Sequence, residues 1–547
     1  MQHGKPPPPN PLRRLALGAF GLGVIAVVLN LVGVNLPSPL PDQPAALNSS
    51  APAPLGQSET EQDSPEHNGA VASSNQEVSR IGEAVLADGG NAVDAAVAMA
   101  YAIGVVEPHT GGPGGGGGAL ISFPKNRDPV FVDFRELSDA TGQERSDRFG
   151  IPGFFHGMDH LGRTYGTQQP AELVAWAVEL AEDGIVITPE FHDLLTQLSH
   201  RINTDESVFF NRGSPREPGE IITQPEAADT LTKVASHGPD YFTSEVIQPA
   251  YPDLSFTLED LEEFLVVERQ PASAEVAGHT VISAPAPFSG STLIHYLTLA
   301  AEHDLPPINK AGGPDLVTYS EIANTTYAAR ARTLTDPRYG GHDVVVEPDE
   351  TAPTHTLGLS PPGEESVTTT HLSVIDGDGM AVSMTLSLGN YFGNGEPRGG
   401  FFGNEVAAFS PVGINVVEPY KKVRSFMAPT IVSGKDTTTA IGSPGGNKIP
   451  QIIGQVLLNL WEGESLVEAT DAPRIVVEGA TVSAELYRGV DSESALDQAG
   501  VEIRLDEHES VYGAVNTVRR SHGEVVQSYA DKRRESSYKE VSVEDAS

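Results

Sequence analysis

Three consecutive threonines, Thr368, Thr369 and Thr370, precede His371 about two thirds of the way along the chain. A threonine that becomes a chain terminus carries a hydroxyl, which can attack a carbonyl, and an amine, which can accept the hydroxyl proton. The run is therefore compatible with acyl transfer from an N-terminal threonine that is exposed when the chain is cut in front of it. Three threonines also suit a β-branched entrance to a buried strand, and the motif alone leaves both interpretations open.

Two further groups could bind a substrate or stabilise charge. Arg135 ends the apolar segment that begins at Phe131, where its guanidinium could hold a carboxylate or form an ordinary surface ion pair. Gly445 and Gly446 follow an apolar strand pattern and precede a helix pattern. Adjacent backbone N–H groups at such a place suit an oxyanion, although a simple strand-to-helix turn has the same residues.

Metal and phosphate chemistry are not expected. His156 and His160 have helical spacing, but three glycines surround them, which predicts a loop, and the glutamate of a zinc-protease motif is missing. The glycine run at 111–118 leads into a strand and lacks a following Lys-Ser/Thr pair, so it indicates close backbone packing instead of a phosphate loop. The chain has no cysteine, so covalent chemistry must use Ser, Thr, Lys or a carboxylate. No cofactor is expected.

The elements that must position these groups follow from periodicity. Apolar residues at alternating positions from 372 to 384, around the turn 377–379, predict a β-hairpin directly after the threonines. The Pro-, Thr- and Gly-rich segment 351–366 before them predicts a mobile linker, as cleavage would require. Helices are expected at 78–85, 92–101, 171–181, 226–236, 258–264, 292–301 and 450–461, and strands at 119–123, 131–136, 281–285, 427–432 and 440–443.

Length and charge limit the class of protein. A chain of 547 residues predicts two to four domains or one large layered domain with attachments. The formal net charge of −40, from 74 acidic and 34 basic residues, argues against binding of nucleic acid or anionic lipid by the main body.

The N-terminal region has the pattern of a membrane-targeting segment. Three basic residues precede an apolar run from 15 to 36 that is long enough to cross a bilayer. We expect residues 1–36 to be an uncleaved single-pass anchor with the catalytic region extracytoplasmic; the alternative is a signal peptide and a secreted protein. Residues 37–74 should be a disordered linker, and residues 531–547 a disordered tail.

Four sequence blocks together resemble the γ-glutamyltransferase (γ-glutamyltranspeptidase) family of the N-terminal nucleophile hydrolase class. The resemblance extends from about residue 78 to about residue 528 in the family's order. The blocks are Gly90-Asn91-Ala92-Val93-Asp94-Ala95-Ala96 through the glycine run, Asp133-Phe134-Arg135-Glu136, Thr369-Thr370-His371-Leu372-Ser373-Val374, and Gly442-Ser443-Pro444-Gly445-Gly446.

The resemblance implies an α+β fold, a four-layer αββα sandwich with two central antiparallel sheets. It implies a large subunit at 75–368 and a small subunit at 369–530, both from one precursor cut between Thr368 and Thr369. Thr369 would be the nucleophile and its freed amine the base. Ser387 would contact the nucleophile. The resemblance further implies an oxyanion hole at Gly445 and Gly446, and a substrate pocket that includes Arg135 and Ser425.

Several positions depart from the family's pattern. Ala408 stands where an aspartate pairs with the donor's α-amine, Phe426 replaces a second pocket serine, and Gly389 replaces a donor-binding asparagine. Glu405 stands where a glutamine is usual. A buried ammonium without a counter-charge is unfavourable, so glutathione-like donors should bind poorly unless Glu405 or Asn390 compensates.

The leading function is therefore a γ-glutamyl transferase or hydrolase that acts on glutathione-like amides, with water, an amino acid or a peptide as acceptor. One alternative is a related acylase or poly-γ-glutamate depolymerase with relaxed recognition of the α-amine. The other is a non-catalytic surface protein that retains the fold.

Overall fold

The computed structural model describes residues 67–124, 127–344, 368–406, 413–485, 502–505, 512–521, 526–534 and 536–542. All of them belong to one compact unit, Ser64–Ser547. The expected anchor at 1–36, the mobile linker at 351–366 and Ala408 lie outside the described residues. Among the helices that the structure describes, none combines the length and the hydropathy required for a membrane span.

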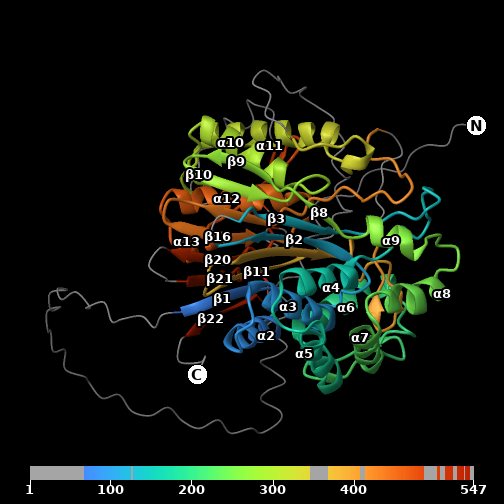
Figure 1. Cartoon of the computed structure of the whole chain (residues 1–547). Coiled ribbons are helices and arrows are strands. Elements are labelled where there is room, and N and C mark those ends of the chain that lie inside the picture. The colour runs from blue at the N-terminus through green and yellow to red at the C-terminus, as the bar shows by residue number, and fades with distance from the viewer. Residues whose placement is uncertain are drawn as a thin grey trace, which may run out of the picture. The chain divides into compact units, whose positions relative to one another are not determined.

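Two antiparallel sheets form the centre of the unit (Figure 1). The seven-stranded sheet has the order β22 (Ser537–Ser542), β1 (His67–Ser73), β11 (Thr370–Asp376), β12 (Ala381–Ser387), β2 (Gly116–Ser122), β3 (Val130–Phe134) and β8 (Val267–Arg269). The six-stranded sheet has the order β21 (Val526–Ala530), β20 (Asn516–Ser521), β16 (Thr437–Gly442), β15 (Thr430–Ser433), β10 (His279–Ser283) and β9 (Ala272–Val276).

Helices cover the outer face of each sheet (Figure 1). The seven-stranded sheet carries α2 (Gln76–Ala87), α3 (Ala92–Val106), α4 (Phe154–Tyr165) and α5 (Pro170–Asp183), and the six-stranded sheet carries α10 (Gly290–Glu302), α11 (Gly313–Thr333) and α12 (Ile449–Trp461). Each interface between neighbouring layers has its own apolar core. The αββα sandwich and the α+β class expected from the sequence are confirmed.

The structure also contains further elements outside the two central sheets and the helices just named. They are β4 (Ile185–Val186), α6 (Pro189–Leu198), η2 (Ser199–Arg201), β5 (Phe210–Asn211), β6 (Ser214–Pro215), β7 (Ile221–Ile222), α7 (Pro225–His237), η3 (Phe242–Ile247), α8 (Gln248–Ala250), α9 (Leu258–Phe264), η4 (Ile308–Lys310), η5 (Pro337–Tyr339), β13 (Pro397–Arg398), β14 (Phe401–Phe402), η6 (Gly446–Lys448), α13 (Leu466–Asp471), β17 (Ile475–Glu478), β18 (Thr481–Ala484) and β19 (Glu502–Leu505).

Helix α3 shows how local sequence builds this architecture. Asn91 caps it by accepting hydrogen bonds from the backbone of Val93 and Asp94, and the Asp94 carboxylate accepts one from the Asn91 backbone. Its small alanine side chains let the helix pack closely between the seven-stranded sheet and the other helices, and nearly every residue is buried. The predicted helix pair and the hairpin of β11 and β12 are both confirmed.

Three expectations from the sequence are wrong. The segment around His156 and His160 is helix α4, because Gly157 does not break the helix but lets it approach the sheet; a Cβ there would lie 2.4 Å from Phe134 Cγ. The two histidines instead bond the carboxylates of Asp240 and Glu268.

The other two errors concern the boundaries of the folded unit. The expected disordered linker at 37–74 contains β1 near its end, and this strand lies between β22 and β11. The expected disordered tail contains Asp531, which is fully buried, and β22, which pairs with β1. Both strands pair with segments that are distant in the sequence and not with their own neighbours along the chain.

Candidate active site

Thr369 immediately precedes β11 and is buried. The Thr368 hydroxyl donates a hydrogen bond to the carbonyl of Gly389 at 2.7 Å, and Arg534 Nη1 donates one to the Thr369 carbonyl at 3.1 Å. The expected cleavage point is therefore held by contacts on both sides of its peptide bond.

The alternation of β11 defines which way the Thr369 side chain projects. Leu372 belongs to the core beneath the helices, whereas Ile375 belongs to the core between the two sheets. Successive strand residues point to opposite faces, so Thr369 shares the inter-sheet face with His371 and Ser373. Thr370 points toward the helices.

The predicted oxyanion turn comes from the other sheet. The Ser383 hydroxyl bonds the Ile441 carbonyl, and the next residue, Gly442, packs so tightly on the His371 ring that a Cβ would lie 2.2 Å from it. Because Ser383 pairs with Ser373, β16 runs along β11 in the direction of Thr369.

The turn that follows β16 leads toward the nucleophile's end of the sheet. Gly445 has φ 143° and Gly446 φ 57°, conformations that favour glycine. Gly446 begins the short η6, which continues directly into α12. Backbone N–H groups at such a helix start can bind a developing oxyanion.

Ser387 lies next to Thr369 across the hairpin. Thr370 pairs with Leu386, and continuing this register by one residue places Ser387 opposite Thr369. The Ser387 hydroxyl accepts a hydrogen bond from the Gly389 backbone N–H at 3.0 Å. The loop after β12 therefore contacts both Ser387 and Thr368.

Arg135 belongs to the same end and the same face of the sheet. Ser387 pairs with Gly116, and the β2–β3 register places Arg135 opposite Gly116. Three strand spacings separate Thr369 from Arg135, which is about 14 Å between backbones. A long arginine side chain and a five-carbon acyl group can together span that distance. Gly116 is required here, since a Cβ would lie 2.4 Å from the Phe134 carbonyl oxygen.

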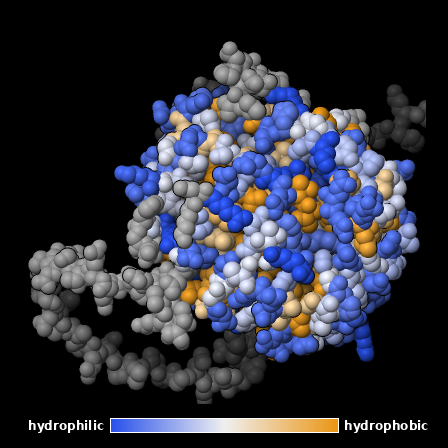
Figure 2. All heavy atoms as spheres, in the orientation of Figure 1, coloured by the Kyte–Doolittle hydropathy of each residue, from blue (hydrophilic) through white to orange (hydrophobic). Residues whose placement is uncertain are grey.

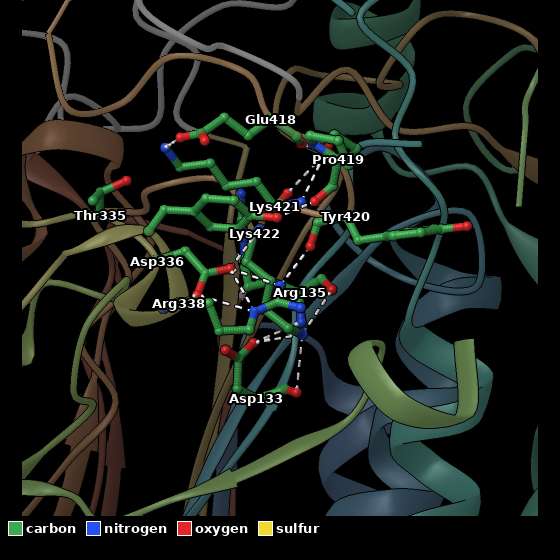
Figure 3. A network of polar contacts seen from close by, with 12 residues as sticks. Asp133, Arg135, Thr335, Asp336, Arg338, Glu418, Pro419, Tyr420, Lys421 and Lys422 are labelled. Carbon is green, nitrogen blue, oxygen red and sulfur yellow. Dashed lines mark hydrogen bonds and ion pairs between the residues drawn. The ribbon is translucent and has the colours of Figure 1, made fainter. Parts of the chain in front are cut away.

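A buried lysine supports the backbone that carries Arg135 (Figure 3). Lys422 Nζ donates hydrogen bonds to the carbonyls of Asp133, Arg135 and Leu265, and it lies 3.1 Å from Asp133 Oδ1. Burial lowers the pKa of Lys422 to about 8. Burial would raise the pKa of Asp133, but the positive charges of Lys422 and Arg269 outweigh it and lower the pKa.

The Arg135 side chain is buried, and its one ion pair among the described residues joins Nε to Glu136 Oε2 at 3.2 Å. Burial raises the pKa of Glu136, partly offset by Arg135.

Glu405 and Asn390 contact each other beside this end of the sheet. Glu405 Oε2 accepts hydrogen bonds from Asn390 Nδ2 at 2.8 Å and from Arg201 Nη2 at 2.6 Å, and Arg148 Nη1 lies 3.9 Å from Oε1. The carboxylate is thus already neutralised by protein cations, which makes it a poor partner for a substrate ammonium.

Two departures from the family's pattern have structural reasons. Gly389 has φ 88°, and a Cβ there would lie 2.5 Å from the Glu405 carbonyl oxygen, so the loop requires glycine. The buried Arg330 guanidinium lies over the Phe426 ring, with Cζ 3.5 Å from the ring centroid. Phe426 also stacks with Tyr327. Tyr327 in turn donates a hydrogen bond to the carbonyl of Asn447, just after the oxyanion turn.

Ser425, the expected pocket serine, is buried, and its backbone N–H donates a hydrogen bond to the Pro287 carbonyl at 2.9 Å. Its hydroxyl accepts a hydrogen bond from the Met427 backbone, and its carbonyl accepts bonds from Ser289 Oγ and Arg330 Nη2. Its position is thus fixed by backbone contacts.

Sequence reasoning did not identify Glu107, Lys422 or Arg534. Glu107 is buried at the end of α3, where it accepts a hydrogen bond from Thr110 Oγ1 at 3.1 Å. Glu107 and Arg534 line a cavity of about 1050 Å³ on the helix side of β11, together with apolar and acidic residues. No local pattern in the sequence marks these residues, because the contacts of each are with segments far away along the chain.

Among the described residues, no three His, Asp or Glu side chains gather in a way that could hold a metal ion. The groups that converge at the start of β11 are a hydroxyl, backbone N–H groups and guanidinium groups. Together they suit acyl transfer to and from a threonine.

A two-sheet αββα sandwich with a threonine at the head of a central strand is the architecture of the N-terminal nucleophile hydrolases. The family model described as Gamma-glutamyltranspeptidase matches residues 78–541, and this chain belongs to that family.

Individual relatives agree with this assignment. The capsule biosynthesis protein CapD proenzyme of Bacillus anthracis is 33% identical, covering 84% of this chain and 88% of its own length. The glutathione hydrolase proenzyme of Pseudomonas sp. (strain A14) is 31% identical, covering 74% and 81%. The crystal structure of cephalosporin acylase from Bacillus halodurans shares the fold, with a TM-score of 0.77 at 23% identity over 90% of this chain and 99% of that one.

Proposed function

We propose that the chain is cut between Thr368 and Thr369 and that the mature protein transfers the acyl group of γ-glutamyl-type amides to water or to an amine. One observation carries the proposal. The register from β11 through β12 and β2 to β3 aligns Thr369, Ser387 and Arg135 on one face of the sheet. Strand β16 runs along this face in the direction of Thr369 and leads into the oxyanion turn.

Maturation would begin with attack of the Thr369 hydroxyl on the carbonyl carbon of Thr368. The peptide C–N bond breaks as the ester forms, and the proton of the hydroxyl moves to the departing Thr369 nitrogen. Water then hydrolyses the ester, which leaves a carboxylate on Thr368 and a free α-amine on Thr369. The hydrogen bonds of Thr368 to Gly389 and of Thr369 to Arg534 support this step, because they fix both sides of the bond.

In turnover, the α-amine accepts the proton of the Thr369 hydroxyl as the oxygen attacks the substrate's amide carbonyl. The N–H groups of Gly445 and Gly446 would stabilise the oxyanion, and Arg135 would bind the carboxylate of the acyl group. The leaving amine takes the proton, and water or an acceptor amine then resolves the acyl-enzyme.

Glutathione-like γ-glutamyl amides are the leading donor class, as in the relatives named glutathione hydrolase. The neutralised Glu405 favours a second class, acyl donors whose α-position carries no free ammonium, such as glutaryl amides or the interior of a poly-γ-glutamate chain. Both classes present the carboxylate that Arg135 would hold.

A denaturing gel and two chromogenic donors test the proposal. The purified protein should give two fragments divided at Thr369, and Thr369→Ala should remain one chain with no turnover. Hydrolysis of γ-glutamyl-p-nitroanilide and of glutaryl-p-nitroanilide then compares the donor classes. A protein that stays in one piece and is inactive would support the non-catalytic alternative, and a strong preference for the γ-glutamyl compound would exclude the second class.

We further propose an extracytoplasmic location. The basic residues before the apolar run at 15–36 support it. Digestion by a protease added to intact cells would test it, since a cytoplasmic protein would be protected.

A further inference from the structure

The side chain of Arg534 contacts the proposed nucleophile directly. Its Nη1 donates a hydrogen bond to the carbonyl of Thr369 itself, at 3.1 Å. In the mature protein that residue would also carry the α-amine. A cation bonded to the carbonyl of a residue lies within about 6 Å of the same residue's amine, close enough to act on its charge.

The backbone of Arg534 is held in place by a buried ionic network. Asp531 is fully buried and pairs with Arg474 at 2.6 Å and with Arg533 at 3.1 Å, while Arg533 also pairs with Glu485 at 2.5 Å. The turn after β21 is therefore fixed, and the direction in which Arg534 leaves it is fixed too.

A carboxylate faces Arg534 from the opposite side. Burial raises the pKa of Glu107, while Arg534, the Thr370 hydroxyl and the Thr110 hydroxyl lower it. Thr370 Oγ1 also hydrogen-bonds Ser74 Oγ at 3.0 Å. The start of β11 is thus held on its helix side by Glu107 and at its carbonyl by Arg534, which leaves the Thr369 hydroxyl on the inter-sheet face.

Other titratable groups lie on the elements around this point, and besides Glu107 three further carboxylates, Glu77, Glu190 and Asp193, line the same cavity as Arg534. Burial lowers the pKa values of His109 and His371 to about 3, so both rings are neutral near pH 7. Glu405 is neutralised by Arg201. The remaining groups that face this end of the sheet are Arg135 with Glu136, Arg533 with its two carboxylates, and Lys448 after the oxyanion turn.

We propose that Arg534 is a positioning residue whose positive charge keeps the α-amine of Thr369 unprotonated, so that the amine can accept the hydroxyl proton near neutral pH. This inference rests on the proposed function, because it requires Thr369 to be a chain terminus. A nearby positive charge disfavours the ammonium form, and at such a separation with an effective dielectric constant of about 20 the amine should titrate about two pH units lower than it otherwise would.

Two titrations of the mature protein test the role of Arg534. One is the pH dependence of kcat/KM for γ-glutamyl-p-nitroanilide and glutaryl-p-nitroanilide, whose acidic midpoint reports the base. The other needs no activity: competitive acetylation of the protein at graded pH, followed by mass spectrometry of the peptide that begins with Thr369, gives the midpoint of the amine directly.

Arg534→Gln should raise both midpoints by about two pH units, whereas Arg534→Lys, which keeps the charge, should leave them within about 0.3 unit of the wild type. Glu107→Gln removes the nearest carboxylate and should lower them. Arg163→Gln, an exposed arginine on α4, is the matched control and should change nothing.

A uniform loss of kcat/KM at every pH in Arg534→Gln, with an unchanged amine midpoint, would show a merely structural role and overturn the inference. If Arg534→Gln does not mature, the Lys and Glu107→Gln proteins decide, since a Glu107→Gln midpoint at or above the wild-type value contradicts the charge effect. Absence of any peptide beginning with Thr369 in the wild type would instead refute the proposed function.

Discussion

At the scale of single residues, the end of β3 depends on one buried lysine. Lys422 Nζ bonds three backbone carbonyls and pairs with Asp133, and no part of its side chain is exposed. Two of those carbonyls belong to Asp133 and Arg135, so the lysine fixes the backbone that aims the proposed carboxylate-binding guanidinium.

Lys422→Met should therefore destabilise the protein strongly. It leaves the Asp133 carboxylate without one of its two cations, and breaking a buried pair in this way costs about 3–5 kcal/mol of unfolding free energy. Urea denaturation measures it. The neighbouring Lys421 is also buried, but its ammonium bonds one carbonyl and the half-exposed Glu418, so Lys421→Met should cost less. Equal losses in the two variants would argue against this role of Lys422.

A second residue-scale prediction concerns acid stability. Burial lowers the pKa of His371 to about 3, below the unfolded value of about 6.5. Between these values the unfolded chain binds the proton and the folded one does not, so the ring's contribution to stability is complete above about pH 6.5 and is lost as the pH falls. The loss approaches about 1.4 kcal/mol per pH unit. The free energy of unfolding, measured with urea, should therefore decrease less steeply from pH 6.5 to 4.5 in His371→Gln than in the wild type. Parallel slopes would contradict the prediction.

At the scale of elements, glycines determine how closely helices approach the sheet. On α4, a Cβ at Gly157 would lie 2.4 Å from Phe134, whereas a Cβ at Gly162 would meet only ordinary contacts at 3.7 Å or more. The two positions share one helix but differ in the space available, and Phe134 directly precedes Arg135.

Alanine at these two glycines should have opposite effects. Gly157→Ala forces α4 away from β3 and should cost about 1–3 kcal/mol, while Gly162→Ala lowers the entropy of the unfolded chain and should be neutral or stabilising by up to about 1 kcal/mol. Thermal unfolding of both variants gives the comparison. A harmless Gly157→Ala would mean that the helix does not pack as closely as described.

The same elements show what the sequence could and could not predict. The β11–β12 hairpin, the close packing of the glycine run and the turn after β16 carry local signals, so these features were predicted correctly, although β2 begins at Gly116 and not at residue 119. Helix α4 was not predicted because glycines in a sequence usually indicate a loop. The reason for Gly157, the close approach of the helix to Phe134, is visible only in the structure. The contacts of Arg534 with Thr369 and of Lys422 with Arg135 join residues 165 and 287 positions apart, and no local pattern encodes such pairs.

At the scale of the whole molecule, hydrophilic residues cover most of the face shown in Figure 2, with apolar residues exposed in small groups between them. The chain carries a formal charge of −40. Beneath this surface, the segments before and after the expected cut both contribute strands to each of the two sheets. In the seven-stranded sheet, β1 from the first segment lies between β22 and β11 from the second, and β12 pairs with β2.

This interleaving predicts the behaviour of the cut protein. Each fragment alone would expose the unpaired edges of both sheets and the core between them, so the two should elute together in size-exclusion chromatography and separate only when the protein unfolds in urea. Deletion of residues 536–547 should lower the urea midpoint, because it removes β22 and leaves β1 as an unprotected edge. Deletion of 543–547, which spares β22, is the control. Fragments that separate without denaturant, or a β22 deletion as stable as the control, would mean that the sheets do not join the two segments as the strand order requires.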